Sequence, residues 1–246
     1  MLIGVKNADE YLSEFVNEVK ELAENGFAYK NKLYSVGIRC FIMDAPARSF
    51  VLGIKGHSGY YSCTRCLQKG EMVKNRVAFL KIGMDPHRDN NSFRSRSQPE
   101  HHNKKDLTVL EILSIDIVKQ VGLDYMHIVC LGVVRTLLKS WVKKKGEPYS
   151  LTSWKIGELS SELKNLKKSC PYEFSRKSRS LDELDRFKAT ELRQFLLYYG
   201  PFVLKPILSE KRYEHFLNLS LAIRILLNSN CSLADIKMAQ NLLIDF

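Results

Sequence analysis

The sequence predicts a mixed α/β half followed by an almost entirely helical half, with the division after residue 148. A β-rich run, KLYSVGIRCFIMD at 32–44, lies in the first half behind an amphipathic segment. After Pro148, apolar residues recur at helical spacing in one segment after another. Apolar residues make up 45% of the 246 residues, which is enough to bury a core. We therefore expect an α/β plus α fold with domains at 1–148 and 149–246.

In the first half, the acid Asp44 is expected at the end of a predicted strand. Apolar spacing predicts a helix over 9–24, and the Asn-Gly pair that follows ends it. The run 32–44 then predicts a buried strand, and Pro46 excludes its continuation as a central strand. Asp44 is therefore expected at the carboxyl end of a strand, where open α/β sheets collect functional groups.

The remaining predicted helices rest on apolar spacing and on capping residues. Ser180 with Glu183, and Ser232 with Asp235, have the spacing of a helix start. Gly200 and Pro201 are expected to stop the helix that Ser180 begins. The predicted helices are 107–122, 123–145, 154–168, 181–199, 209–228 and 232–245.

The net charge indicates which kind of partner to expect, and the number and spacing of the cysteines indicate the redox state of the compartment. The chain has 38 basic and 27 acidic residues, a formal net charge of +11, which favours a polyanionic partner, nucleic acid before a membrane surface. Six scattered cysteines do not form the pattern of a secreted disulfide scaffold, so we expect a reducing compartment. The sequence shows no signal peptide and no apolar run of membrane-spanning length, so we expect a soluble protein.

The run HSGYYSCTRC holds two cysteines, Cys63 and Cys66, at the spacing of half a zinc site. Thiolates at i and i+3 can converge on one tetrahedral ion, but zinc needs about four ligands and the chain has no second CxxC. His127 is the best remaining ligand, with Asp124 three residues before it and Cys130 three after. Other histidines at 57, 101 and 102 are alternatives, and a redox pair or chance spacing also fits. His57, His101 and His102 thus stay open as ligands.

Two further features have a structural and a functional interpretation. Asp44 is either a turn-forming residue ahead of Pro46 or a carboxylate that holds a divalent ion for phosphoryl chemistry. The run 164–179 is either a solvated face or a phosphate-contact surface, since basic side chains supply sequence-independent affinity for DNA. Its basic residues are Lys164, Lys167, Lys168, Arg176, Lys177 and Arg179.

Taken together, three stretches carry a resemblance to a known family. They are CFIMDAPARSFVLGIKGHSGYYSCTRCLQKGE at 40–71, GLDYMHIVCLGVVRTLLKSWV at 122–142 and the run 172–208. The chain resembles the transposase domain of EnSpm/CACTA-like DNA transposons over nearly its whole length. The resemblance implies a partial RNase H-like mixed sheet with a large α-helical insertion, in which two aspartates and a later acid hold two divalent ions.

The resemblance also assigns roles to individual residues. Asp44 matches the second metal-binding aspartate, and Cys63 and Cys66 match a CxxC that follows it. Asp124 with His127 matches a D-x-x-H element, which either helps to complete the metal site or lies near the catalytic edge. The cysteines are then expected to hold a structural zinc, and Mg²⁺ is expected only in a complete catalytic core. The basic residues of 164–179 would contact DNA.

Departures from the family pattern limit the expected activity. The first aspartate should lie upstream of the helix at 9–24 and the third acid beyond the helical insertion, and neither has a match in these 246 residues. Glu191 is an acid within the insertion and does not replace the third acid. We therefore expect a nuclear, DNA-associated fragment of a cut-and-paste transposase that is inactive alone and could form homo-oligomers. The alternative is a zinc-stabilised helical interaction module without a DNA role.

Overall fold

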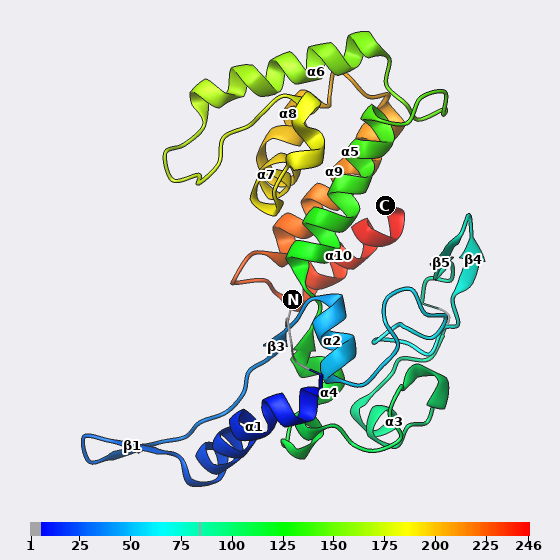
Figure 1. Ribbon diagram of the computed structural model, residues 1–246. Helices are drawn as coiled ribbons and strands as arrows, with labels where there is room; N and C mark the ends of the chain where they lie inside the picture. Colours follow the sequence, from blue (N-terminus) through cyan, green and yellow to red (C-terminus); the bar gives the residue numbers. More distant parts are fainter. Residues whose placement is uncertain (1–5, 84) are drawn as a thin grey trace. The chain divides into compact units, whose positions relative to one another are not determined.

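The computed structural model describes residues 6–83 and 85–246, and the chain forms two compact units, up to Asp124 and from Tyr125 on (Figure 1). The sequence pattern placed the division after residue 148, whereas the contacts divide the chain earlier. The cause is the helix that carries Leu138 and Trp141, because both side chains are buried in the core of the second unit. We refer to the two parts as unit 1 and unit 2.

Apart from the 18-residue α1, short elements joined by loops make up unit 1, and unit 2 is helical. Unit 1 contains α1 (Ala8–Asn25), β1 (Phe27–Tyr29), β2 (Lys32–Tyr34), β3 (Phe41–Ile42), α2 (Ala45–Val51), β4 (Glu71–Val73), β5 (Arg76–Ala78), α3 (Asn90–Arg94), η1 (Pro99–His101), η2 (Val109–Ile112), α4 (Ile117–Gln120) and β6 (Val121–Gly122). Unit 2 contains η3 (Met126–Val134), α5 (Arg135–Val142), α6 (Ser153–Leu166), η4 (Lys167–Ser169), η5 (Leu181–Arg186), α7 (Ala189–Gln194), η6 (Phe195–Tyr199), α8 (Gly200–Val203), α9 (Glu210–Leu226) and α10 (Leu233–Asp245).

The strands pair in three separate two-stranded sheets. β1 with β2 and β4 with β5 are antiparallel hairpins, and β3 with β6 is a parallel pair. The described residues therefore show a mostly helical protein with small sheets, and they do not show the mixed RNase H-like sheet that the resemblance implied. The β-rich run 32–44 forms only β2 and β3, because the backbone between them makes no ladder. Lys30 and Asn31, both at positive φ, close the first hairpin.

The core of unit 1 lies where α1 packs against η2 and α2, and where α3 packs against α4. Its buried apolar side chains include Val16, Leu52, Ile54, Phe93, Leu110, Ile117 and Val121. Polar contacts from α3 and its loop hold the segment that follows. Arg94 donates to the carbonyls of Glu111, Leu113 and Ile115, and Arg96 makes a two-pronged ion pair with the Glu111 carboxylate at 2.8 Å for each bond.

The predicted helix over 107–122 is wrong as a continuous element. The structure has the short turn η2, an extended Leu113, and then a new helix, α4, that Asp116 caps by accepting the N–H groups of Val118 and Lys119. The apolar residues have helical spacing, but the three carbonyls held by Arg94 stop the helix from running through. A long-range contact therefore overrides local propensity here.

The core of unit 2 is a set of helices packed around aromatic side chains. Figure 1 shows α9 and α10 side by side, and α9 carries Phe216, which is fully buried. The Phe216 ring meets Trp141 edge-on at 6.2 Å and Phe195 at 5.9 Å. Gly200 allows this approach, since a Cβ there would lie 2.5 Å from Phe216 Cζ. Phe216 is thus the packing centre of unit 2.

The predicted helix 181–199 begins and ends differently in the structure. Ser180 Oγ accepts the N–H of Asp182 and starts only the 3₁₀ turn η5, since Phe187 is extended. The α-helix starts afresh at Ala189, and Glu191 caps it by accepting the N–H of Lys188. The helix does not stop at Gly200 but continues as α8. Pro201 lies in α8 directly after the π-helical turn η6.

The other predicted helices are confirmed within one or two residues at most ends. These are 9–24 (α1), 154–168 (α6 with η4), 209–228 (α9) and 232–245 (α10), and 123–145 corresponds to η3 and α5 together. Gly26 at φ 74° ends α1, and the Ser232–Asp235 capping box is present. Within the described residues, we find no helix with the length and apolar character needed to span a bilayer.

Removing the Phe216 ring should destabilise unit 2 strongly. Phe216→Ala leaves a cavity against Trp141 and Phe195, so we expect the free energy of unfolding to fall by about 3–5 kcal/mol. Phe202→Ala is the matched control, because Phe202 is 76% exposed and should cost little. Urea denaturation followed by circular dichroism measures both. Equal stabilities of the two variants would contradict this packing.

Candidate functional site

The CxxC turn brings its two sulfur atoms together on one side. Cys63 Sγ accepts the amide N–H groups of Arg65 and Cys66, each at 3.4 Å, and the Cys63 and Cys66 sulfurs lie 3.3 Å apart. Two thiolates on one tetrahedral zinc lie roughly 3.8 Å apart, so a small rotation would suffice to chelate the ion. Burial raises the pKa of the Cys66 thiol. The turn therefore fits two ligands of a zinc site.

A buried arginine holds the backbone of this turn. Arg88 is only 4% exposed, and its Nη2 donates to the carbonyls of Cys63 at 3.4 Å and Cys66 at 3.3 Å, and to Gln98 Oε1 at 2.6 Å. The backbone of Arg88 also donates to the Arg65 carbonyl at 2.8 Å. Burial lowers the pKa of Arg88. A buried cation with these contacts fixes the backbone of the turn.

A second arginine joins the turn to the parallel strand pair. Arg65, the third residue of the CxxC, donates through Nη2 to the Val121 carbonyl at 2.9 Å and through Nη1 to the Val118 carbonyl. Val118 lies in α4 and Val121 begins β6. Burial lowers the pKa of Arg65. The CxxC turn is therefore attached directly to the strand that leads to Asp124.

The parallel pair β3–β6 places two carboxylates at the same sheet edge. Phe41 pairs with Val121 and Ile42 with Gly122, so Asp44 and Asp124 each follow two residues beyond the last pair of the register. The carboxyl ends of parallel strands meet at one edge of a sheet, which is where functional groups of open sheets lie. Asp44 Oδ1 accepts the Ala47 N–H at 2.8 Å and caps α2, whereas the structural interpretation of the sequence was a turn ahead of Pro46.

Arg48 lies one helical turn after Asp44 and is influenced by both carboxylates. Burial is the main cause that lowers the pKa of Arg48, and the positive charge of Arg65 adds to it, while Asp124, Asp44 and Cys63 act in the opposite direction. The four charged or ionisable groups therefore lie within electrostatic range of one guanidinium. Arg48 Nη1 is buried and, among the described residues, has no hydrogen-bond partner.

The histidines predicted as zinc ligands lie in several different parts of the chain. His57 is exposed, and His101 and His102 are buried with pKa values that burial lowers to about 4. His101 Nδ1 lies 2.6 Å from the Tyr61 carbonyl, close to the CxxC turn. His127 is exposed in the π-helical η3 of unit 2, whereas the cysteines belong to unit 1. Among residues 6–83 and 85–246, no three His, Cys, Asp or Glu side chains form a group that could hold a metal.

The predicted DNA-contact residues lie at the end of α6 and in the loop that follows. Five of them are exposed: Lys164, Lys167, Lys168, Arg176 and Lys177. Arg179 is the exception, because its guanidinium pairs with Glu191 at 2.6 Å and with Glu183 at 2.7 Å. These pairs raise the pKa of Arg179. Arg179 is therefore engaged in holding the fold, while the other five remain accessible to a phosphate.

Sequence reasoning missed the arginines of this site. The position of Arg65 inside the CxxC and the spacing of Arg48 four residues after Asp44 were visible signals, since i and i+4 share a helix face. Arg88 had no comparable signal, because its importance arises from a contact with a turn far along the chain. The resemblance allowed Asp124 a place near the catalytic edge, but the register that puts it beyond the same sheet edge as Asp44 required the folded chain.

Comparison of the chain with models of known protein families, with curated proteins and with solved structures gives no match.

Removing Arg179 should destabilise unit 2. The Glu191 side chain is only 4% exposed, so Arg179→Ala leaves a buried carboxylate without its ion-pair partner. Breaking such a pair costs about 3 kcal/mol, which urea denaturation would resolve. Lys177→Ala removes an exposed charge from the same loop and should change stability by less than about 0.5 kcal/mol. A stable Arg179→Ala variant would show that Glu191 is satisfied in another way.

Proposed function

We propose that this chain is a transposase-derived, DNA-associated protein whose Asp44 and Asp124 contribute to a divalent-cation site. The observation that carries the proposal is the parallel register of β3 and β6, since it puts both acids just beyond one sheet edge. In this proposal, the strand pair is part of a partial RNase H-like core and the helices of unit 2 contain the insertion.

The chemistry of the site follows from its donor atoms. Among the residues that the structure describes, Asp44 uses only Oδ1, for capping, which leaves Oδ2 for a ligand, and carboxylate oxygens suit Mg²⁺. A bound divalent ion would stabilise the attacking and leaving oxygens in strand cleavage. Two-metal catalysis needs more carboxylates than this pair. Asp44 and Asp124 should therefore bind the cation, but by themselves they should not support DNA cleavage.

The CxxC has a structural role in this proposal. Zinc bound by Cys63 and Cys66 would lock the turn that Arg88 holds and Arg65 attaches to β6. The ion would thereby fix the strand before Asp124, whereas a role in the reaction itself is not required. The two further ligands would come from the unit 1 histidines His57, His101 and His102 or from solvent molecules.

DNA association is supported by the exposed basic residues and by the net charge. Five of the six basic side chains of the run 164–179 are exposed, and phosphate contacts need no defined pocket. The proposed location is the nucleus, where DNA is the partner.

A second function, a zinc-stabilised interaction module, is favoured by one observation. The hairpin β1–β2 exposes Phe27 (51%), Tyr29 (52%) and Leu33 (72%), which is an unusual apolar density for a solvated hairpin. A protein partner or a second copy of the chain could cover it. Salt-dependent affinity for duplex DNA separates the two functions, since only the first requires phosphate contacts.

The cation site is tested by titrating the full chain with Mn²⁺ in a calorimeter. We expect Asp44→Asn and Asp124→Asn each to weaken Mn²⁺ binding at least tenfold, because each removes a charged ligand. Asparagine still caps a helix, so Asp44→Asn should keep α2 intact. The control is Asp106→Asn, which changes an exposed acid elsewhere in unit 1. Undiminished Mn²⁺ binding in both site variants would refute the assignment.

The zinc site is tested by metal analysis of the purified chain. We expect about one zinc per chain, lost in Cys63→Ser and Cys66→Ser and retained in Cys231→Ser. Because burial raises the pKa of Cys66 and the metal binds thiolates, occupancy should fall as the pH is lowered. Zinc that is absent from the wild-type chain, or equally present in all variants, would exclude this site.

A further inference from the structure

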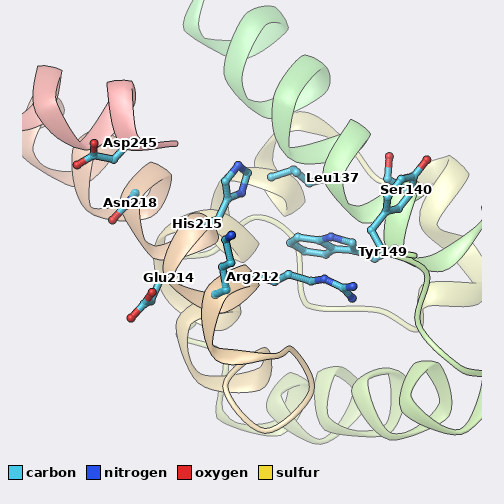
Figure 2. Close-up of a pocket in the computed structure, with 10 residues that line it drawn as sticks. Leu137, Ser140, Tyr149, Arg212, Glu214, His215, Asn218 and Asp245 are labelled. Atoms are coloured by element: carbon cyan, nitrogen blue, oxygen red, sulfur yellow. The ribbon is translucent and has the colours of Figure 1, made fainter. Parts of the chain in front are cut away.

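Unit 2 contains a groove of about 790 Å³ that none of the sites above uses (Figure 2). It lies among α5, the loop after α5, α9 and the end of α10. Its lining residues are Leu137, Ser140, Trp141, Tyr149, Lys211, Arg212, Glu214, His215, Asn218 and Asp245. This volume is ample for a small organic molecule or one nucleotide.

The apolar part of the groove is built from two aromatic side chains held in place. Trp141 is 5% exposed and rests edge-on against Phe216, so the indole is a rigid part of the floor. Its carbonyl accepts the Leu151 N–H at 2.8 Å, which fastens the loop that carries Tyr149. Tyr149 is half-buried, and Lys144 Nζ lies 5.6 Å from its ring centroid and 3.4 Å from its hydroxyl.

Two cationic residues from the first turn of α9 line the groove. Lys211 is exposed, and Arg212 donates to the Pro148 carbonyl next to Tyr149. Within the described part of the chain, neither cation forms an ion pair with a carboxylate. In the view of Figure 2, the Arg212 side chain extends toward Tyr149, whereas Glu214 and Asp245 lie at the opposite side. Arg212 therefore lies at the aromatic end of the groove and the two acids at the other end.

We propose that this groove binds one unpaired nucleotide of single-stranded DNA. The base would lie against Tyr149 and the exposed edge of Trp141, and its phosphate near Lys211 and Arg212. Aromatic platforms beside cations are how single strands are held without sequence readout, and each stacked base contributes about 1–3 kcal/mol. The acidic end would repel a second phosphate, so the strand should leave the groove on the cationic side.

Duplex DNA does not fit this site, because its bases are already stacked and paired. An acidic peptide would use the cations but not the aromatic floor. The inference goes beyond the proposed cation site, since all of its residues lie in unit 2 and none depends on Asp44 or Asp124.

Trp141 supplies a local signal for the test. The chain has two tryptophans, so Trp154→Phe in the full chain leaves Trp141 as the only indole emitter, and Trp154 is 72% exposed and outside the groove. We expect a twelve-residue oligothymidylate to quench Trp141 emission, with a blunt duplex of equal length quenching it much less. Binding seen by anisotropy of a labelled oligonucleotide without quenching of Trp141 would overturn the proposal.

Variants in the same background separate stacking from charge. Tyr149→Ala should weaken the quenching titration about tenfold, and Lys211→Gln a few-fold, because the first removes the platform and the second one phosphate contact. Lys237→Gln, an exposed cation on α10 outside the groove, is the charge-matched control and should leave the titration unchanged. Equal effects of Lys211→Gln and Lys237→Gln, or none from Tyr149→Ala, would overturn the proposal. Asp44→Asn should leave the quenching intact, so failure of the cation site is distinguishable.

Discussion

The attachment of Arg65 to the carbonyls of Val118 and Val121 is the interaction on which the candidate site depends. It joins a turn near residue 65 to a strand near residue 121, two segments that otherwise have only short elements to place them. β3 and β6 are each two residues long, so their own ladder bonds cannot define the register firmly. The guanidinium, itself partly buried, adds charge-assisted hydrogen bonds at the point where the register is set. A second contact acts beside it, since Gln120 Nε2 donates to the Ile38 carbonyl at 2.8 Å and joins the residue before β6 to the segment that leads to β3.

This constraint explains why a CxxC and an acid pair occur in one small unit. Arg88 holds the backbone of the cysteine turn, and Arg65 joins the turn to the backbone of α4 and β6. A zinc ion bound at the turn would therefore influence the position of the acids only through the backbone. Arg48 supplies a positive charge beside the acids, and a cation that binds there would compete with this charge. Unit 2 is organised differently. Its helices pack around Phe216 and leave a groove with aromatic and cationic side chains at the surface.

How far the sequence predicts this structure depends on the range of the contacts involved. Helices α1, α6, α9 and α10 follow from apolar spacing and from caps such as Gly26 and Ser232, which are local signals. The segments 107–122 and 181–199 have the same spacing but are broken by side-chain contacts, the first by Arg94 on the carbonyls of Glu111, Leu113 and Ile115, the second by Arg179 on Glu191 and on the Arg186 carbonyl. The site follows the same rule, since Asp44 and the CxxC were visible as motifs, but their connection through Arg65 was not. Strand register, too, requires the folded chain.

The most direct measurement is hydrogen exchange of the segment Val118–Asp124, compared between the wild-type chain and Arg65→Met. Methionine keeps much of the side-chain length but removes the donors to Val118 and Val121. If Arg65 holds this segment, exchange in Val118–Asp124 should be faster in the variant, while exchange in α9 of unit 2 should be unchanged and serves as the internal reference. Equal exchange of Val118–Asp124 in both proteins would show that the strand is held by something else, and the CxxC turn would lose its proposed link to the acids.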